Sequence, residues 1–484
     1  MKKFALLFFV ILSLILVSCS KKEEELEKKE DPNAVATIME GDVFEERAKI
    51  DDGLEEVDFK GREFRVVGML DKEFAFDENA INKGQLIMDA LHKRDTIVEE
   101  RFNIQLTPIF SGKYTEVQDW VSKTVLSGVD EFDLLMNTAV STASLNRKRL
   151  FLNWYNVPYV DFSKPWWAKS TVEELTYDNK CVTAISDANS TAIYFSYCMV
   201  FNKNLANSYD FDNIYDAVFR GDWTFEYFYD LVKDIYRDDD GDGFKSEGDF
   251  YGFAQGHEYV DSWLYAFDNP VMGKDEDGVP TIILKTDKIN AIVDGIHDLC
   301  HNINGVYYDS QRGYGDGMFL EKRAIFNLTS IATLMTQGYR DFNDEYGLLP
   351  IPKWDKSQKE YYTTVSGGHT VMAIPKTAKD LEFIGLISEA LASESYKHVT
   401  PTYYEIALKT RYLRDNESKK VLDILVDGRV YDFGTIFSNW SGFGSVLGHL
   451  VREDNDNFES FYQRKYKSAR NVYKSALMAF DKLD

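Results

Sequence analysis

The chain has 484 residues, of which 44% are hydrophobic and 14% aromatic, and its formal net charge at pH 7 is −25. This apolar content is typical of a well-packed globular protein and excludes a disordered chain. The length exceeds that of one compact domain and suits two or three lobes. A surface this acidic repels phosphate backbones, so nucleic acid is excluded as a partner.

Residues 1–18 have the pattern of a bacterial lipoprotein signal peptide. Two lysines precede an almost unbroken apolar run from Phe4 to Val17, which is too short for a membrane span and indicates a cleaved signal. The run ends in Leu16-Val17-Ser18-Cys19, which resembles a lipobox, so we expect Cys19 to be acylated and to become the new N-terminus. The alternative is an ordinary signal peptide with an incidental cysteine. The pattern predicts a lipid-anchored protein on the extracellular face of the bacterial cytoplasmic membrane.

Residues 19–57 are expected to form an acidic flexible stalk. Nearly every residue from Lys21 to Asp31 is charged, and further acids follow as far as Glu56. Such a segment cannot bury enough apolar surface to fold on its own. We therefore expect it to stay extended and to hold a folded body away from the membrane.

The body begins near Phe59 with alternating strand and helix patterns. Apolar periodicity predicts strands and helices in turn, over 64–67, 87–102, 104–106, 117–125 and 132–136. This order predicts an α/β sheet with crossover helices. Because ligands bind outside the carboxyl ends of strands in such sheets, Asn137 and Thr138, directly after the third strand, are placed to reach a ligand.

Beyond this first part the patterns are less regular. Residues 183–201 look strand-like, residues 346–351 and 371–374 predict short strands, and the last hundred residues look helical. Once Cys19 is acylated, the remaining cysteines are odd in number, so not all can pair within the chain. The sequence leaves open whether Cys181 and Cys198 form a disulfide.

An acidic loop after Ile235 matches the spacing of an EF-hand calcium loop. Acids stand at loop positions one, three, five and twelve, and a glycine stands at position six. Four apolar residues from Phe225 to Ile235 predict a helix that ends at this loop. Position twelve is an aspartate instead of the longer glutamate, which lowers the expected affinity. The alternative is an acidic surface turn. We predict a structural Ca²⁺ whose ligands are Asp238, Asp240, Asp242, the carbonyl of Phe244, and Asp249.

Tryptophans and tyrosines in polar segments are candidate sugar platforms. Sugars present apolar CH faces beside hydroxyl groups, so their sites combine exposed aromatic rings with carboxylate or amide partners. For any single tryptophan, core packing is the more frequent role. The candidates are Trp154, Tyr155, Trp166, Trp167, Trp263 and Trp440.

Enzyme motifs are mostly missing. The chain has no G-x-S-x-G, no H-E-x-x-H and no phosphate-binding glycine loop. A glycosidase needs two carboxylates several ångströms apart, which a sequence cannot show. His297 and His301 could share a helix face as metal ligands, but no third ligand is recognisable, which favours a solvated helix surface.

Five segments in order along the chain resemble the extracellular solute-binding lipoproteins of carbohydrate ABC importers. Within this maltose-binding-type group the chain looks closest to the clostridial branch, and the resemblance runs from about residue 60 to about residue 445. The segments are Ser163-Lys164-Pro165-Trp166-Trp167, Val200-Phe201-Asn202-Lys203-Asn204-Leu205, Gly221-Asp222-Trp223-Thr224 followed by the acidic loop and Tyr251-Gly252-Phe253, Tyr346-Gly347-Leu348-Leu349-Pro350-Ile351-Pro352-Lys353, and Pro401-Thr402-Tyr403-Tyr404-Glu405.

The resemblance implies an α/β, two-lobed periplasmic-binding-protein-like fold of class II, with the ligand in the cleft between the lobes. The first lobe would comprise 58–187 and about 366–400, and the second 188–365 and about 401–484. The chain would cross near 187–191 and return near 366–370, where the sequence Ser-Gly-Gly-His over 366–369 would be a flexible hinge. The implied ligand residues are Asn137, Asp187, Glu258, Tyr259, Trp263, Asn327 and Trp440.

The leading hypothesis is therefore a monomeric, lipid-anchored receptor without catalytic activity. It would capture a carbohydrate, in particular an oligosaccharide, and deliver it to the permease subunits of an ABC transporter. A secreted carbohydrate-active enzyme, such as a glycoside hydrolase or lyase, is the alternative. A third possibility is a surface scaffold whose calcium loop is its main feature.

Overall fold

The structure is a computed structural model that describes residues 42–70, 73–75, 85–310, 314–438 and 442–483. The chain forms two compact units, Met1–Asp51 and Asp52–Asp484, and in the first the structure describes helix α3 (Asp42–Ala48). The predicted signal peptide, Cys19 and much of the predicted stalk lie outside the described residues. Within the described ranges, every helix is too short or too polar to cross a membrane.

The first sheet contains the strands that the sequence predicts at the start of the body. In the part of the chain that the structure describes, its order is β13-β3-β1-β2. β1 runs parallel to β2 and β3, and β13 is antiparallel to β3. Phe64, Val66 and Val67 are fully buried, as their apolar pattern predicts. The strands are β1 (Arg62–Gly68), β2 (Ile104–Ser111), β3 (Leu134–Thr138) and β13 (Thr370–Ala373).

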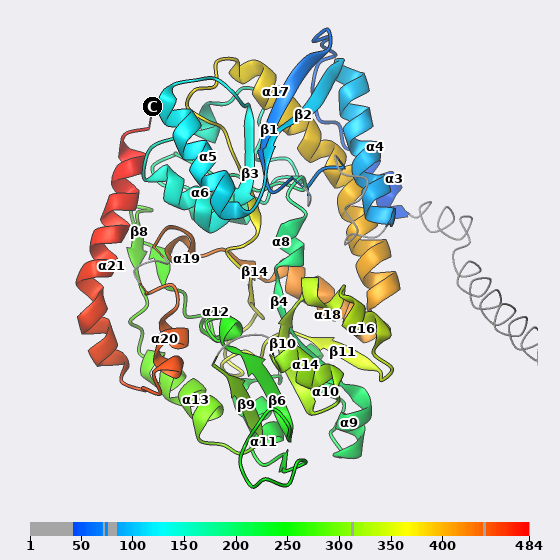
Figure 1. Ribbon diagram of the computed structural model, residues 1–484, viewed down its shortest axis with the longest axis vertical. Helices are drawn as coiled ribbons and strands as arrows, with labels where there is room; N and C mark the ends of the chain where they lie inside the picture. Colours follow the sequence, from blue (N-terminus) through cyan, green and yellow to red (C-terminus); the bar gives the residue numbers. More distant parts are fainter. Residues whose placement is uncertain (1–41, 71–72, 76–84, 311–313, 439–441, 484) are drawn as a thin grey trace, which may run out of the picture. The chain divides into compact units, whose positions relative to one another are not determined.

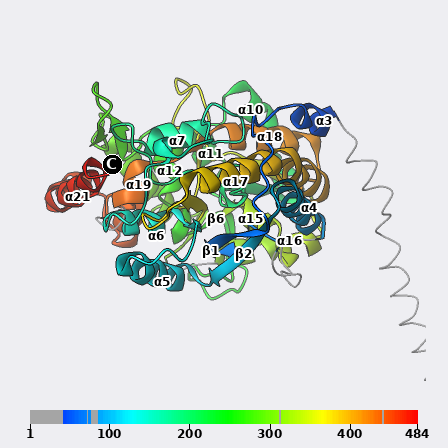
Figure 2. The same ribbon diagram turned by 90° about the horizontal axis from the view of Figure 1, so that it is seen from above.

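Both predicted crossover helices are present. α4 (Gln85–Phe102) links β1 to β2, and α5 (Tyr114–Ser127) links β2 to β3. Gly128 ends α5 with a φ of 78°, a left-handed conformation that favours glycine. Far along the chain, α17 (Leu381–Glu394) lies beside α4 (Figures 1 and 2). Its Phe383 ring packs edge-on against Phe64 of β1, at a centroid distance of 5.8 Å. A helix that follows all strands of the first sheet in the sequence thus completes the hydrophobic core beside that sheet.

The second sheet is built around β4 (Tyr197–Asn202), which is antiparallel to both of its neighbours. Its order among the described residues is β11-β4-β10-β6-β5, with β9 also paired to β6. The strand-like pattern over 183–201 is wrong for its first part, because the Asn189 side chain accepts from Ser186 N at 3.0 Å and turns the backbone before α8 (Thr191–Tyr194). The other strands are β5 (Tyr236–Arg237), β6 (Phe250–Gly256), β9 (Val306–Asp309), β10 (Ala324–Ser330) and β11 (Tyr346–Leu349).

The remaining elements surround these sheets (Figure 1). Two small ribbons pair β7 (Met272–Lys274) with β8 (Pro280–Ile282) and β12 (Thr363–Thr364) with β14 (Arg429–Val430). The short 3-10 helices are η2 (Trp154–Asn156) and η3 (His257–Tyr259), and the π-helices are η4 (Ser395–Val399) and η5 (Thr402–Tyr412). The α-helices are α6 (Ala139–Asn146), α7 (Lys169–Leu175), α9 (Lys203–Ser208), α10 (Ile214–Arg220), α11 (Phe225–Val232), α12 (Ser262–Ala266), α13 (Ile289–His301), α14 (Tyr314–Leu320), α15 (Ile331–Leu334), α16 (Gln337–Asp341), α18 (Asn416–Asp427), α19 (Phe433–Ser438), α20 (Val446–Arg452) and α21 (Phe458–Asp481).

Glu73 joins the two segments that connect the sheets. Its side chain is fully buried. Oε2 accepts from the backbone N and the hydroxyl of Ser190 at 2.9 and 3.0 Å. Oε1 accepts from the hydroxyl of Thr191 at 3.0 Å and from that of Thr370. One carboxylate therefore holds the outgoing and the returning chain together.

The predicted hinge forms a turn at the edge of the first sheet. His369 N donates to Ser366 O at 3.0 Å, and Ala139 N donates to His369 O at 2.8 Å. A Cβ on Gly367 would lie 2.5 Å from a methyl carbon of Val140, so any larger residue here would displace the Val140 side chain. His369 is buried, which lowers its pKa to about 4, and its imidazole is therefore neutral at pH 7.

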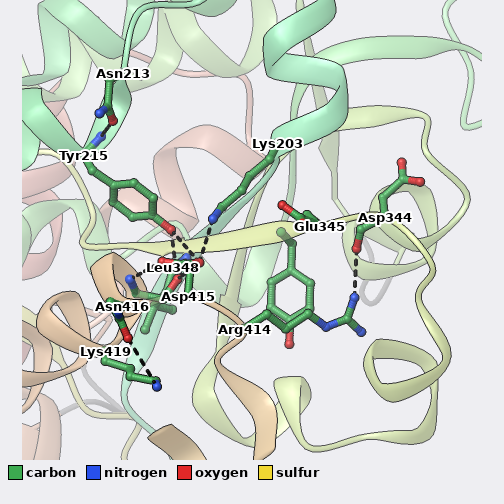
Figure 3. Close-up of polar contacts among 12 residues, drawn as sticks. Lys203, Asn213, Tyr215, Asp344, Glu345, Leu348, Arg414, Asp415, Asn416 and Lys419 are labelled. Atoms are coloured by element: carbon green, nitrogen blue, oxygen red, sulfur yellow. Dashed lines mark hydrogen bonds and ion pairs between the residues drawn. The ribbon is translucent and has the colours of Figure 1, made fainter. Parts of the chain in front are cut away.

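A further segment returns from the π-helices to the second sheet through a polar cluster (Figure 3). Asp415 accepts from Lys203 Nζ at 2.7 Å and from the Tyr215 hydroxyl at 3.2 Å. Arg414 Nη1 donates to Asp344 O at 2.9 Å. These contacts fasten the start of α18 to α9, to α10 and to the segment before β11. Leu348 N of β11 also donates to the Ser418 hydroxyl of α18 at 2.9 Å. Lys203, part of a segment that carries the family resemblance, therefore acts here as a structural anchor.

Four of the candidate tryptophans belong to the core. Trp154, Trp166 and Trp263 are fully buried and Trp167 is 3% exposed, so core packing, the more frequent role, applies to them. The indole N–H groups of Trp166 and Trp167 each donate to Glu389 of α17 at 2.8 Å. The cysteines at 181, 198 and 300 are all buried and free, which answers the question of the disulfide.

Candidate functional site

A polar cavity of about 540 Å³ lies between the second sheet and the hinge. We call it the hinge cavity, because Ser366 is one of its lining residues. The others come from the start of β4, from the segment after β6 and from α20 with its preceding residue. The full lining is Tyr197, His257, Glu258, Asp261, Ser366, Ser445, His449 and Arg452.

The end of β6 places Glu258 in this lining. β6 is parallel to β9 and β10, so its carboxyl end lies at the edge of the sheet where ligands bind in α/β folds. The chain then turns directly into η3, which begins at His257. A Cβ on Gly256 would lie 2.6 Å from Oε2 of Glu258, so glycine allows the carboxylate to fold back over the strand end.

Asp261 connects η3 to α20. Its Oδ1 accepts from Gly448 N, in the first turn of α20, at 3.0 Å. Burial raises the pKa of Asp261 to about 6, although the hydrogen bonds from Gly448 and Leu447 and the charge of His449 act in the opposite direction. The wall formed by α20 is thus positioned by a carboxylate that the sequence places beside Glu258.

The two histidines of the cavity are each held by a hydrogen bond. His257 Nδ1 lies 2.9 Å from the Tyr308 hydroxyl. His449 Nδ1 donates to Ser445 O at 2.7 Å, so Nε2 is the acceptor in the neutral imidazole. With the guanidinium of Arg452 and two carboxylates, the lining presents donors and acceptors together. Such a surface suits a ligand rich in hydroxyl groups.

Tyr259 supports the aromatic part of the cavity from behind. Its ring packs edge-on against that of Tyr197, with centroids 5.0 Å apart. Tyr197 is a lining residue, whereas Tyr259 is half-buried next to it. Burial raises the pKa of the Tyr259 hydroxyl, so it stays protonated and able to donate at neutral pH. Of the residues implied by the resemblance, Glu258 lines the hinge cavity and its neighbour in the chain, Tyr259, packs behind Tyr197. Their contact with a ligand stays a prediction.

Two other implied ligand residues of the second lobe lie in the core. The Trp263 indole donates to Gln255 Oε1 at 3.0 Å and is fully buried. Asn327 is also fully buried, and its Nδ2 donates to Asp316 Oδ1 at 2.6 Å. Both side chains stabilise the end of the sheet behind η3. Their contact with a ligand stays a prediction.

The implied residues of the first lobe lie at the ends of connecting segments. Asn137 and Thr138 were predicted to follow the third strand directly, but both lie inside β3, because they pair with Val371 and Thr370 of β13. Asn137 is fully buried, its Nδ2 lies 3.3 Å from Tyr114 O, and its Oδ1 has no hydrogen-bond partner among the described residues. Asp187 is half-buried, and its backbone N donates to Trp166 O at 2.8 Å. Trp440 lies outside the described residues. The roles of these residues also stay predictions.

A second cavity of about 470 Å³ is lined by residues of β7, β14 and α7, and none of the implied ligand residues lines it. Its lining includes Glu174, Lys274 and Asp432. The Asp432 carboxylate accepts from Met272 N at 3.0 Å and from Thr435 N at 2.8 Å, which ties β7 to α19. The Asp432 carboxylate thus serves a structural role. We take the hinge cavity as the candidate ligand site because it lies at the carboxyl end of β6 and contains Glu258.

The acidic loop brings three of its predicted calcium ligands together. Oxygens of Asp238, Asp240 and Asp242 all lie within 4.8 Å of one another. Gly243, at loop position six, has a φ of 78°, as the sharp turn requires. Asp249 is buried below the loop, where it accepts from Ser246 N at 2.9 Å and from Asp239 N at 3.1 Å. The donor set of the three exposed acids therefore fits calcium, whereas Asp249 already closes the loop base.

The helix expected to end at this loop stops earlier. α11 ends at Val232, and the loop lies between β5 and β6. That part of the prediction is wrong, because Ile235 N instead donates to Val232 O at 3.1 Å and the chain turns to form β5 beside β6.

Sequence reasoning missed most of the hinge-cavity lining. Tyr197 lies about 250 residues before His449 and Arg452 of α20, and none of the three belongs to a motif. Only the segment around Glu258 could be recognised from the sequence, because its acidic residues stand beside aromatic residues, a combination that is typical of sugar sites.

No protein-family model matches the chain, and no curated protein matches it in sequence. Solved structures do share its fold. The ABC substrate-binding protein Lmo0181 from Listeria monocytogenes, in complex with cycloalternan, matches with a TM-score of 0.52 and 10% identity over 87% of this chain and 99% of its own. UgpB from Mycobacterium tuberculosis, in complex with glycerophosphocholine, matches with a TM-score of 0.52 and 12% identity over 87% of this chain and 98% of its own. The chain thus has the two-lobed α/β fold of these substrate-binding proteins, as its motifs predicted.

Proposed function

We propose that this protein is the solute-binding receptor of an ABC importer and that it captures a carbohydrate in the hinge cavity. It would do no covalent chemistry. Hydrogen bonds from the lining and stacking on Tyr197 would hold the ligand, and closure of the lobes would signal occupancy to the permease subunits. The predicted lipid anchor at Cys19 would keep a monomeric receptor at the extracellular face of the membrane.

The observation that carries this proposal is the polar lining of the hinge cavity in a substrate-binding-protein fold. The lining combines Glu258 and Asp261 with Arg452 and two histidines, around a tyrosine ring. Carboxylates and a guanidinium can each form paired hydrogen bonds with neighbouring hydroxyl groups. The solved neighbour with cycloalternan shows that this fold accommodates an oligosaccharide.

A thermal-shift screen of the purified chain against mono- and oligosaccharides, with calcium held constant, tests the proposal. A ligand at 100 times its Kd adds about 2.7 kcal/mol to the free energy of unfolding, which moves the melting temperature by several degrees. We expect a selective shift that Glu258→Gln and Arg452→Gln remove. Glu276→Gln, which changes an exposed glutamate, is the matched control and should keep the shift.

Further measurements separate this proposal from its alternatives. Small-angle scattering should show compaction when the ligand binds, which a scaffold would not show. Chromatography of the sugar after incubation should show it unchanged, whereas a hydrolase or lyase would release products. Glycerophosphocholine belongs in the panel because it is the ligand of the other neighbour. A shift with that compound alone would replace the carbohydrate by a phosphodiester ligand.

A further inference from the structure

Two histidines and an aspartate form a cluster outside the hinge cavity. His297 and His301 lie one helical turn apart at the end of α13. Asp454 follows α20 in a left-handed turn with a φ of 49°. One ligand atom of each residue lies within 4.8 Å of the others. We call these residues the histidine cluster. The tertiary structure thus supplies the third ligand that the sequence could not identify.

The distances within the histidine cluster suit a tetrahedral metal ion. His297 Nε2 lies 2.9 Å from Asp454 Oδ1, and His301 Nδ1 lies 3.8 Å from the same oxygen. Zinc bonds of about 2.0–2.2 Å at a tetrahedral angle separate two ligand atoms by about 3.4 Å. The two observed distances lie on either side of this value. Small rotations of the side chains would therefore bring all three atoms into the first coordination sphere.

A hydrogen bond fixes His301 in the tautomer that a metal needs. Its Nε2 lies 2.8 Å from Val451 O. A carbonyl oxygen can only accept, so Nε2 carries the proton and the lone pair is on Nδ1, the atom nearer to Asp454. Metal-binding histidines typically donate their other ring N–H to a carbonyl or carboxylate in this way.

The exposure of the three side chains leaves a path for an ion. The side chain of His297 is 13% exposed and that of His301 is 25% exposed, whereas that of Asp454 is 72% exposed. Two partly buried imidazoles and one open carboxylate leave a fourth position for water. Imidazole nitrogen is a ligand for zinc and similar ions, whereas calcium takes oxygen ligands.

We propose that the histidine cluster binds a divalent cation of the zinc class and thereby links the turn after α20 to α13. α20 also carries His449 and Arg452 of the hinge cavity. The metal would therefore stiffen one wall of that cavity. This site is separate from the acidic loop and does not depend on the identity of the solute.

The test is zinc chloride titrated into the full chain by calorimetry, with calcium in excess to occupy the acidic loop. We expect one zinc ion per chain, with affinity at least about tenfold lower in each of His297→Gln, His301→Gln and Asp454→Asn. His92→Gln, which changes an exposed histidine on α4, is the matched control and should bind like the wild type. Cobalt at one equivalent should give the strong visible absorption of a tetrahedral complex.

Two results would overturn the proposal. One is a wild-type chain that binds no zinc, so that the contact of His297 with Asp454 is an ordinary ion pair. The other is zinc binding that all three cluster variants retain, because the ion would then bind elsewhere. If a variant fails to fold, the cobalt spectrum of the wild type decides, since an octahedral spectrum also contradicts the proposed ligand set.

Discussion

Glu73 should be the side chain whose loss most disturbs the connection between the two sheets. It is fully buried, and its carboxylate accepts hydrogen bonds from Ser190, Thr191 and Thr370. In Glu73→Ala these donors lose their acceptor and a small cavity forms. Glu73→Gln keeps the size of the side chain and one amide oxygen.

The magnitude follows from the kind of donor. A buried donor without an acceptor costs about 1–3 kcal/mol. The N–H of Ser190 is fixed in direction and loses its bond completely, whereas the hydroxyl groups can turn towards one another. With the cavity included, we expect Glu73→Ala to lower the free energy of unfolding by about 3–5 kcal/mol. In Glu73→Gln the amide oxygen can face Ser190 N, so the expected loss is about 1–2 kcal/mol.

Urea unfolding followed by tryptophan fluorescence measures these changes, because several tryptophans are fully buried. Glu63→Gln is the matched control, since Glu63 is exposed on β1 and its change should stay within about 0.5 kcal/mol. The reasoning is refuted if Glu73→Ala behaves like the control, or if alanine and glutamine cost the same.

Three further predictions concern a glycine, a carboxyl group and the acidic loop. Gly385→Ala should destabilise α17, because the added Cβ would lie 1.9 Å from the carbonyl oxygen of Pro158. In Gly317→Ala on α14 the added Cβ meets nothing within 4 Å, so this variant should be more stable by about 0.5–1 kcal/mol. Thermal unfolding measures both variants, and equal effects would contradict the reasoning. Burial raises the pKa of Glu389 from 4.5 to about 7, so the folded state keeps a proton that the unfolded state releases. The free energy of unfolding should therefore fall as the pH rises from about 4.5 to about 7, by up to about 3 kcal/mol more than in Glu389→Gln. Urea unfolding of both proteins at about pH 4.5 and at about pH 7 measures the difference. Parallel pH profiles of the two proteins would be incompatible with the raised pKa. Removal of millimolar calcium with a chelator should lower the free energy of unfolding by about 1–3 kcal/mol and therefore lower the melting temperature. Asp240→Asn should abolish this difference. A wild-type melting temperature that does not depend on calcium would rule the site out.

Much of the fold could be predicted from the sequence because its signals are local. The apolar period around Phe64 and that from Ile87 to Phe102 each depend on neighbours within a few residues, and both elements formed as expected. The two-lobed architecture followed from segments whose order and spacing resemble a known family. The apolar pattern over 183–196 wrongly predicted a strand, because the side chain of Asn189 stabilises a turn there that a hydrophobic pattern does not reveal.

The candidate sites show where local information ends. The sequence by itself determined that Glu258 stands among aromatic residues, that three acids alternate in the loop at Asp238, and that two histidines have the spacing of one helical turn. Only the tertiary structure decided that Trp263 is buried, that Arg452 faces the hinge cavity, and that Asp454 lies beside those histidines. The physical reason is that the chain passes between the sheets more than once. Residues hundreds of positions apart therefore become neighbours through packing, and no short-range pattern in a sequence encodes that proximity.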